Sequence, residues 1–567
     1  MQNSQNKKFS RRLFIGTLLP LAAVASCSKG QKPGTDPTPG GGLPDIPDKA
    51  GMNVKGIVHA NGSGIPNVVV SDGIAMTKTD AQGIYYLASS KVNPYVFISI
   101  PGNYEVSSER GIPRFFQSLN LAASVVETKS FQLTPVDNAN HVVLAMADLH
   151  LANRNNDISQ FETGFIKDAN DVIKSYKDRG VKVYGLTLGD LTWDTYWYTS
   201  RYFLDDYLSV MNKLDTSVFN IMGNHDNDPY YANDSQAEQT FKRTIGPSYY
   251  SFNLGKVHYV VLDNVEYINT GGTQGSIGDR SYNGKVVSTQ MEWLKKDLAT
   301  ISKDTPVVVA MHIQLNNRPT LNASGQPTST LRLSNSSELL AAFNGFSNIH
   351  ILTGHVHINY AWENTAAIME HNTGAVCATW WWTGKSGYAG NHICKDGSPG
   401  GYGIWEINDK DIKWKYKGIG CDQDYQFRAY DLNKCHITAA AYAPNSTDVL
   451  LKTYAGEYAN ENNNNEVLIN VWGFDEKWKI EITEEGVPLT VSRVDVKDPL
   501  HIISYEAFRL NDNATPTSEF ATTNSAHMFK VTASNATSTL VIKVTDRFGR
   551  VYTENMQRPK ALTYSMK

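Results

Sequence analysis

Five short polar motifs hold the residues of this chain whose types suit metal chemistry. They are Asp148-Leu149-His150, Gly189-Asp190, Gly223-Asn224-His225-Asp226, His312 and Gly354-His355-Val356-His357. Imidazole nitrogens combined with carboxylate and amide oxygens suit divalent ions such as Zn, Mn or Fe. Asp148 and His150 alternate along the chain, so both side chains can reach one ion. A carboxylate such as Asp190 can bridge two cations, because each of its two oxygens can contact one.

The motifs come directly after apolar runs that are typical of strands buried on both faces. These runs are 142–147, 181–188, 218–222, 306–311 and 349–353, with a further run at 257–262. Helical spacing of apolar residues appears at 158–176, and helices are also expected near 202–214, 288–301 and 336–344. Strands that alternate with helices indicate an α/β core. Because ligands bind at the carboxyl ends of strands in open α/β sheets, the motifs should converge there.

Both flanks of this core have a different pattern, with short β-type runs separated by turn signals. We predict an N-terminal β-sandwich over 51–137, a core over 138–422 and a C-terminal β-sandwich over 423–567. The segment 64–85 resembles the carboxypeptidase-regulatory-like fold, which implies an accessory module. Residues 28–50 are rich in Pro and Gly and predict a flexible linker.

The N-terminus has the pattern of an export signal. Basic residues precede a short apolar stretch over 13–24, which predicts a signal peptide over 1–27. Arg11 and Arg12 lie in a segment that resembles a twin-arginine signal. The residues before Cys27 resemble a bacterial lipobox, so we expect a chain lipid-anchored in the cell envelope, at the periplasm or the outer membrane. An ordinary cleaved signal with an incidental cysteine is the alternative.

Charge and cysteine content limit the possible partners. The 567 residues include 52 Lys+Arg and 56 Asp+Glu, a net charge of −4, so there is no basic excess of the kind that nucleic-acid binding needs. Four cysteines besides Cys27 are expected to be structural or free, and the sequence leaves their pairing open.

Taken together, the motifs resemble those of the calcineurin-like metallophosphoesterase family over about 141–420. The resemblance implies a two-sheet α/β/β/α core and a dinuclear metal centre. The implied ligands of the first ion are Asp148, His150, Asp190 and His357, and those of the second are Asp190, Asn224, His312 and His355. The resemblance also makes His225 the catalytic histidine that is not a ligand, and Asp226 a candidate to orient it.

Two positions depart from related patterns. Trp193 stands where the purple acid phosphatases of this superfamily carry a tyrosine ligand, so a tyrosinate-coloured iron centre is not expected. Gln314 stands where relatives often have proline, which alters the local turn and leaves the ligand His312 in place.

The expected function is hydrolysis of small phosphate monoesters or diesters by a hydroxide bound to two divalent ions, which are Mn, Zn or Fe. The alternative is a catalytically inactive cell-surface binding protein on the same scaffold. Hydrolysis of a peptide or amide bond is not favoured, since no His-Glu-x-x-His motif is present.

Loops around the centre must select the substrate. The aromatic segment 193–198 follows Asp190 and predicts a pocket wall, whereas Trp380 to Trp382 fit a core or a pocket equally well. The segment 264–283 is expected to be a long loop that is either a lid over the site or uninvolved.

Overall fold

The computed structural model describes residues 44–385 and 389–566, of which 45–566 belong to one compact unit. The predicted signal peptide, the lipobox with Cys27 and most of the predicted linker lie outside the described residues. Within the described part, no helix has the length and apolar character needed to cross a membrane.

The first core sheet has five strands in the order β16-β15-β14-β27-β28. The strands are β14 (Asn140–Met146), β15 (Lys182–Thr187), β16 (Val218–Phe219), β27 (Gly401–Asn408) and β28 (Asp411–Gly418). The first three run parallel, and β27 pairs antiparallel with β14. Six of the seven residues of β14 are buried, as expected for a strand covered on both faces.

The second core sheet has six strands in the order β17-β18-β21-β24-β26-β25. They are β17 (Tyr250–Leu254), β18 (Val257–Val261), β21 (Val307–Ala310), β24 (Ile349–Thr353), β25 (Tyr360–Thr365) and β26 (Ile368–Asn372). The run from β18 through β21 and β24 to β26 is parallel. Both sheets therefore bring the carboxyl ends of consecutive parallel strands to one edge.

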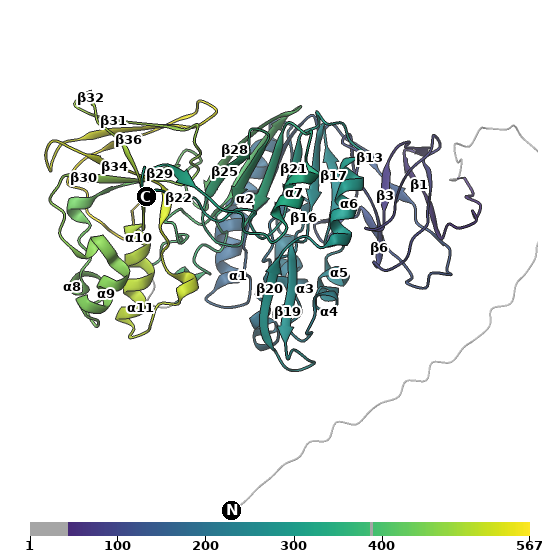
Figure 1. The fold of residues 1–567 in the computed structure, drawn as a ribbon, viewed down its shortest axis with the longest axis horizontal. Coiled ribbons are helices and arrows are strands. Elements are labelled where there is room, and N and C mark those ends of the chain that lie inside the picture. Colours follow the sequence, from purple (N-terminus) through teal and green to yellow (C-terminus); the bar gives the residue numbers. More distant parts are fainter. Residues whose placement is uncertain (1–43, 386–388, 567) are drawn as a thin grey trace, which may run out of the picture. The chain divides into compact units, whose positions relative to one another are not determined.

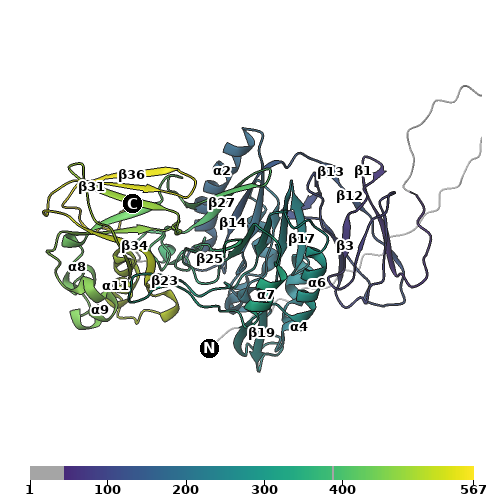
Figure 2. The ribbon, with the colours of Figure 1, turned by 45° about the horizontal axis from the view of Figure 1, so that its top comes forward.

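Helices cover the core sheets (Figures 1 and 2). The α-helices of this region are α1 (Asp157–Gln160), α2 (Lys167–Lys177), α3 (Leu204–Met211), α4 (Asp234–Ala237), α5 (Gln239–Thr244), α6 (Ser288–Leu298) and α7 (Ser336–Ala342), of which the longest are α2 and α6. On α2 the buried residues Ala169, Val172, Ile173 and Tyr176 recur at helical spacing, so that one face packs inward. The predicted two-sheet α/β core is confirmed.

The N-terminal region forms two facing sets of strands. One centres on β1 (Val54–Ala60), which pairs with β2 (Ser63–Gly64), β5 (Ile84–Leu87), β11 (Glu127–Thr128) and β12 (Phe131–Gln132). The other contains β3 (Val69–Ser71), β4 (Met76–Lys78), β6 (Tyr95–Ile98) and β10 (Phe116–Ser118). Its apolar residues join those of the core in one continuous cluster.

The C-terminal region contains two four-stranded sheets. One has the order β29-β30-β34-β33, with β29 (Phe427–Asp431), β30 (Glu466–Val471), β33 (Ser492–Val496) and β34 (Ser525–Thr532). The other has the order β32-β31-β35-β36, with β31 (Lys479–Glu484), β32 (Val487–Pro488), β35 (Leu540–Thr545) and β36 (Val551–Met556).

Helices that the sequence pattern does not predict lie between these strands. They are α8 (Ala439–Tyr442), α9 (Asp448–Ala455), α10 (Pro499–His501) and α11 (Ala507–Asn511). Together with Tyr430 and Leu468 of the first sheet they bury an apolar cluster of their own, which includes Leu451 and Leu500. The strand-rich C-terminal region is confirmed, but it is a sandwich with helices on one side.

One predicted loop is in fact regular structure. The segment 264–283 forms a hairpin of β19 (Val265–Thr270) and β20 (Asp279–Gly284). Val265 and Tyr267 are buried, and the residues that alternate with them are not, which is the pattern of a half-buried strand. The cysteines behave as expected, since Cys377, Cys394 and Cys435 are buried free thiols.

Candidate metal centre

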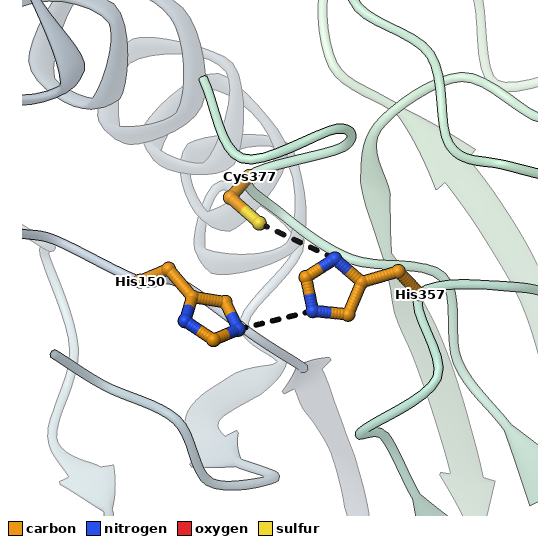
Figure 3. A group of neighbouring side chains, drawn as sticks. All are labelled: His150, His357 and Cys377. Carbon is orange, nitrogen blue, oxygen red and sulfur yellow. Dashed lines mark hydrogen bonds between the residues drawn. The ribbon is translucent and has the colours of Figure 1, made fainter. Parts of the chain in front are cut away.

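The first group of predicted ligands converges beyond β14, β15 and β24. The Nε2 atoms of His150 and His357 are 3.0 Å apart (Figure 3). The Oδ1 atom of Asp148 lies 3.5 Å from His357 Nε2, and the Oδ2 atom of Asp190 lies 3.4 Å from His150 Nε2. All four side chains are buried. Two imidazole nitrogens and two carboxylates therefore face one small volume.

The second group lies on the other side of Asp190. His312 Nε2 is 3.2 Å from Asp190 Oδ2, 3.0 Å from Asn224 Oδ1 and 3.1 Å from His355 Nδ1. The same Asp190 oxygen therefore lies close to a histidine of each group. The seven residues predicted as ligands are brought together in the predicted pairing, and their identity as ligands stays a prediction.

Tight backbone packing positions these side chains. The backbone N–H of His355 donates to both carboxylate oxygens of Asp148, at 3.0 and 2.9 Å. A Cβ atom on Gly354 would lie 2.7 Å from Asp148 Oδ2, and one on Gly223 would lie 2.1 Å from Asp190 N. Glycine in the third and fifth motifs is therefore required by the close approach of these loops.

The backbone at the ligands is also unusual. Asp148, His150, Asp190, His355 and His357 have φ values of 54°, 45°, 52°, 76° and 55°. Non-glycine residues rarely adopt this left-handed conformation, and it clusters at functional sites. The surrounding sheets therefore hold the five side chains in place against a local cost.

The pKa values of several side chains in the centre are strongly shifted. Burial would raise the pKa of Asp190, but His312, His225 and His150 outweigh this and hold it well below its usual range. Burial would lower the pKa of His312, but Asp190 and Asp148 raise it to about 9. Burial lowers the pKa of His150 and His355. Asp190 is thus kept ionised beside the neutral imidazoles of His150 and His355, and carboxylate and imidazole are donors that fit divalent cations.

His225 lies beside the two groups of ligands and is held by Asp194. Its Nδ1 atom is 2.7 Å from Asp194 Oδ1. Burial would lower the pKa of His225, but Asp190 and Asp194 outweigh it and raise it. Asp194 thus orients His225, and Asp190 and Asp194 together favour the protonated form of its ring.

Asp226, predicted as the candidate to orient His225, occupies a different place. Its carboxylate accepts the backbone N–H groups of Gly223, Leu191 and Thr192 at 2.9, 3.1 and 3.0 Å. It therefore ties the loop of Asp190 to the loop of Asn224. The role of orienting residue passes to Asp194, which stands four positions after Asp190 in the same loop and was not predicted.

The centre opens into a solvent-exposed cavity of about 350 Å³. The hairpin β19–β20 supplies one wall, through Tyr267, Arg280 and Tyr282. The guanidinium of Arg280 donates to both Asp194 oxygens at 2.8 and 2.7 Å, and Tyr282 Oη lies 2.8 Å from His355 Nε2. The predicted loop is therefore part of the site, as a hairpin.

The two aromatic segments divide between wall and core. Trp193 packs its ring 5.6 Å from that of His150, while Trp197 is fully buried. Trp380 lines the cavity and stacks on His357 at 3.9 Å. Trp381 is buried and donates to Leu149 O at 2.7 Å. Each segment therefore contributes one tryptophan beside the centre and one to the core.

Cys377 contacts His357, a member of the first group of predicted ligands, on the side of its ring that faces away from His150. Its Sγ atom lies 3.6 Å from His357 Nδ1, on the ring edge opposite the Nε2 atom that faces His150 (Figure 3). The carbonyl oxygen of Ala378 lies 3.1 Å from the same Nδ1. These contacts fix the orientation of the His357 ring, as the outer contacts of metal-binding histidines do.

Comparisons with solved structures return chains of low identity. A dimetal phosphatase from Danio rerio is 11% identical, with 49% of this chain and 96% of that chain covered and a TM-score of 0.33. A sulfate thiohydrolase, SoxB, from Termus thermophilus is 11% identical, with 50% and 57% covered and a TM-score of 0.29. A 5'-nucleotidase from Candida albicans is 12% identical, with 48% and 50% covered and a TM-score of 0.25. This chain spans about half the length of the last two.

No curated protein sequence is significantly similar to this chain. Three family models match it in succession. Residues 52–136 match the N terminal of calcineurin-like phosphoesterase, residues 141–359 match calcineurin-like phosphoesterase, and residues 370–552 match the C terminal of calcineurin-like phosphoesterase. The middle match contains every predicted ligand. The chain therefore belongs to the calcineurin-like phosphoesterases, a family of metal-dependent phosphoester hydrolases, and carries the N- and C-terminal regions of that family.

Proposed function

We propose that this phosphoesterase hydrolyses small phosphate monoesters or diesters at a pair of divalent ions, in the cell envelope. The observation that carries the proposal is the position of Asp190. One of its oxygens lies 3.4 Å from His150 and 3.2 Å from His312, which belong to different groups of ligands. A carboxylate in that position supports two cations that share it as a bridge.

The chain's own residues fit such a pair of ions. Asp148, His150, His357 and Asp190 would hold one, and Asn224, His312, His355 and Asp190 would hold the other. When bound, two such ions lower the pKa of water and neutralise the charge of a phosphate group. Mn, Zn and Fe all suit nitrogen and oxygen donors of this kind.

His225 supplies the acid in this proposal. Its Nδ1 atom faces Asp194, so its Nε2 atom is the one that can carry a proton to the leaving oxygen. The raised pKa favours the protonated ring, as a general acid requires. Arg280 also contacts Asp194. The Asp194 carboxylate is therefore held in a fixed position between the His225 ring and the Arg280 guanidinium.

The location in the cell rests on the N-terminal sequence. The twin-arginine-like segment, the lipobox and the Pro- and Gly-rich stretch after it support export followed by lipid attachment at Cys27. Cys27→Ser should move the protein from the membrane fraction to the soluble fraction and abolish incorporation of labelled fatty acid. Membrane association that persists in this variant would contradict lipid anchoring.

The proposed activity is tested with the purified chain loaded with Mn, Zn or Fe and supplied with chromogenic phosphate monoesters and diesters. We expect turnover that increases with occupancy up to two ions per chain, measured by elemental analysis. Asp190→Asn should remove both turnover and bound metal while circular dichroism stays unchanged. A folded chain that binds no metal and cleaves no ester would support the binding-protein alternative instead.

A further inference from the structure

One lysine faces the catalytic cavity without a carboxylate partner. Lys395 lines the cavity together with His150 and Asp190. Its Nζ atom lies 5.6 Å from the ring centre of Trp380, and no carboxylate of the described residues lies within ion-pair distance of it. Two other basic side chains of the lining, Arg280 and His225, are both paired with Asp194. Lys395 is therefore the lining cation that is left to bind an incoming anion.

The C-terminal region fixes the backbone of this lysine. Lys395 O accepts the N–H of Thr523 at 3.1 Å. The next residue, Asp396, is fully buried; its carbonyl accepts Asn470 Nδ2 at 2.7 Å and its carboxylate lies 3.2 Å from His527 Nε2. These three partners come from β30, β34 and the turn before β34. Lys395 therefore belongs to a rigid part of the cavity wall.

The same region closes the wall beside Trp380. The short turn of Ser518–Phe520 brings Phe520 against Trp380, with ring centres 4.2 Å apart. Buried His501 links the segment that holds Trp380 to the C-terminal region. Its Nε2 atom is 2.9 Å from Thr379 Oγ1 and its Nδ1 atom is 2.6 Å from Thr522 Oγ1. The wall is thus continuous from the segment after β26, which holds Thr379 and Trp380, to the C-terminal region.

Glu519 is the acid of the same turn that borders the cavity. It is exposed, it accepts Ser518 Oγ at 2.9 Å, and it lies beyond ion-pair distance from Lys395. Burial lowers the pKa of Lys395, while Asp148 and Asp396 partly offset this effect. An anion that reached the ammonium would favour its charged form, since an opposite charge stabilises a partly buried cation.

We propose that Lys395 binds a second anionic group of the substrate, so that the enzyme prefers phosphate esters that also carry another phosphate or a carboxylate. This inference rests on the proposed function, in which the metal centre holds the phosphate that is cleaved. The second anion would then lie against Lys395, beside the ring of Trp380. The C-terminal region would accordingly act as a part of the substrate site.

Matched substrate pairs test the preference. Fructose 1,6-bisphosphate against fructose 6-phosphate varies a phosphate, and 3-phosphoglycerate against glycerol 3-phosphate varies a carboxylate. We expect a higher kcat/KM for the doubly anionic member of at least one pair. The pair with the larger difference shows whether Lys395 prefers a phosphate or a carboxylate. Lys395→Met should lower that ratio about 10- to 100-fold, the usual effect of a hydrogen bond to a charged group. Lys395→Arg should retain the preference, because it keeps the charge.

Lys434→Met is the matched control, since Lys434 is exposed and does not line the cavity. It should leave the ratio unchanged. A wild-type ratio near one for both pairs would overturn the inference, and so would an equal loss on both members of a pair in Lys395→Met.

A binding measurement separates this inference from the proposed function. Calorimetry compares methylenediphosphonate with methylphosphonate on the Mn-loaded protein, and neither compound needs to be hydrolysed. We expect tighter binding of the diphosphonate, with the difference lost in Lys395→Met and kept in Lys395→Arg. If esters are not cleaved but this difference is present, the proposed function fails and the anion site stands. If esters are cleaved and the difference is absent, the anion site fails alone.

Discussion

The two strand-rich flanks meet the catalytic core in different ways. The N-terminal region shares one apolar cluster with the core, where the ring centre of Phe115 lies 4.5 Å from that of Tyr250. The C-terminal region buries separate clusters, and its contacts with the core include buried polar side chains such as Asp396, His501 and His527. Among the described residues that line the cavity, Glu519 comes from the C-terminal strands and turns, and none comes from 45–137.

This difference separates two tasks. Apolar burial is strong and non-directional, so a shared apolar cluster supplies stability. Hydrogen bonds between buried polar side chains are directional, so they specify the positions of the groups that they join. We therefore expect changes in the N-terminal contact to alter stability, and changes in the C-terminal contact to alter how substrates bind.

The largest effect is expected in the core itself, where neither flank supplies the reacting groups. His225→Ala should lower kcat by about 100- to 10,000-fold, the range of a general acid. Bound metal should stay at the wild-type amount, because His225 is not a predicted ligand. Steady-state kinetics with elemental analysis checks both expectations. Full turnover in a variant with intact metal content would exclude the acid role.

A substitution in the contact between the N-terminal region and the core should lower the free energy of unfolding and leave substrate preference unchanged. Phe115→Ala removes a fully buried ring that packs between Phe219 and Tyr250. We expect a loss of about 3–5 kcal/mol in the free energy of unfolding. Values of kcat/KM measured well below the melting temperature should stay close to those of the wild type. A changed substrate preference in this variant would remove the contrast between the flanks.

Acid should weaken the side of the core that faces the C-terminal region. His350 Nδ1 lies 3.0 Å from His371 Nε2, and both rings pack on Trp414, which Arg547 of the C-terminal region covers. Burial lowers the pKa of His350 to about 3 and holds that of His371 well below its usual value.

The sign of the pH effect follows from these depressed values. Both rings are neutral when folded, whereas they gain protons below about pH 6.5 when unfolded. Their stabilising effect is therefore complete above pH 6.5 and is lost as the pH falls toward 3. Urea unfolding at pH 7.5 and 5.5 should show a loss of roughly 1–3 kcal/mol. The double variant His350→Gln, His371→Gln should show a smaller loss, and an equal loss would assign the effect to other groups.

The smallest effect is expected in the cavity wall of the C-terminal region. Phe520→Ala removes a ring stacked on Trp380 and should raise KM about 2- to 10-fold, with kcat changed less, as for one aromatic pair. Thermal unfolding should be close to that of the wild type, because Phe520 is only partly buried. A large loss of stability with an unchanged KM would place this turn with the scaffold.

The sequence predicted the centre because its motifs are local and each follows a strand of the core. Parallel strands then bring Asp148, Asp190 and His357 to one edge without further information. Asp194 could have been considered as the residue that orients His225, since it lies in the loop of Asp190. Asp226 was preferred because it is next to His225 in the sequence. Proximity along the chain was misleading there, because the side chain of Asp226 turns back to the backbone of Leu191 and Thr192.

Other parts lay beyond local patterns. The alternation of Val265, Tyr267 and Asn269 was visible and would have predicted a strand, although Gly, Ser and Thr nearby suggested a loop. The C-terminal helices have between three and eight residues, too few for a clear helical period. Lys395 and Glu519 are far apart in sequence and belong to no motif. Only the tertiary packing of the C-terminal region brings them to the cavity.

The left-handed backbone at five of the predicted ligands has an evolutionary consequence. Each such residue costs about 1–2 kcal/mol relative to an ordinary conformation, and glycine would remove most of that cost. A lineage that no longer used the metals could therefore gain stability by mutation at Asp148, His150, Asp190, His355 and His357. A chain that keeps all five strained side chains gives up this gain in stability. We therefore expect all five to be kept only where selection for catalysis continues.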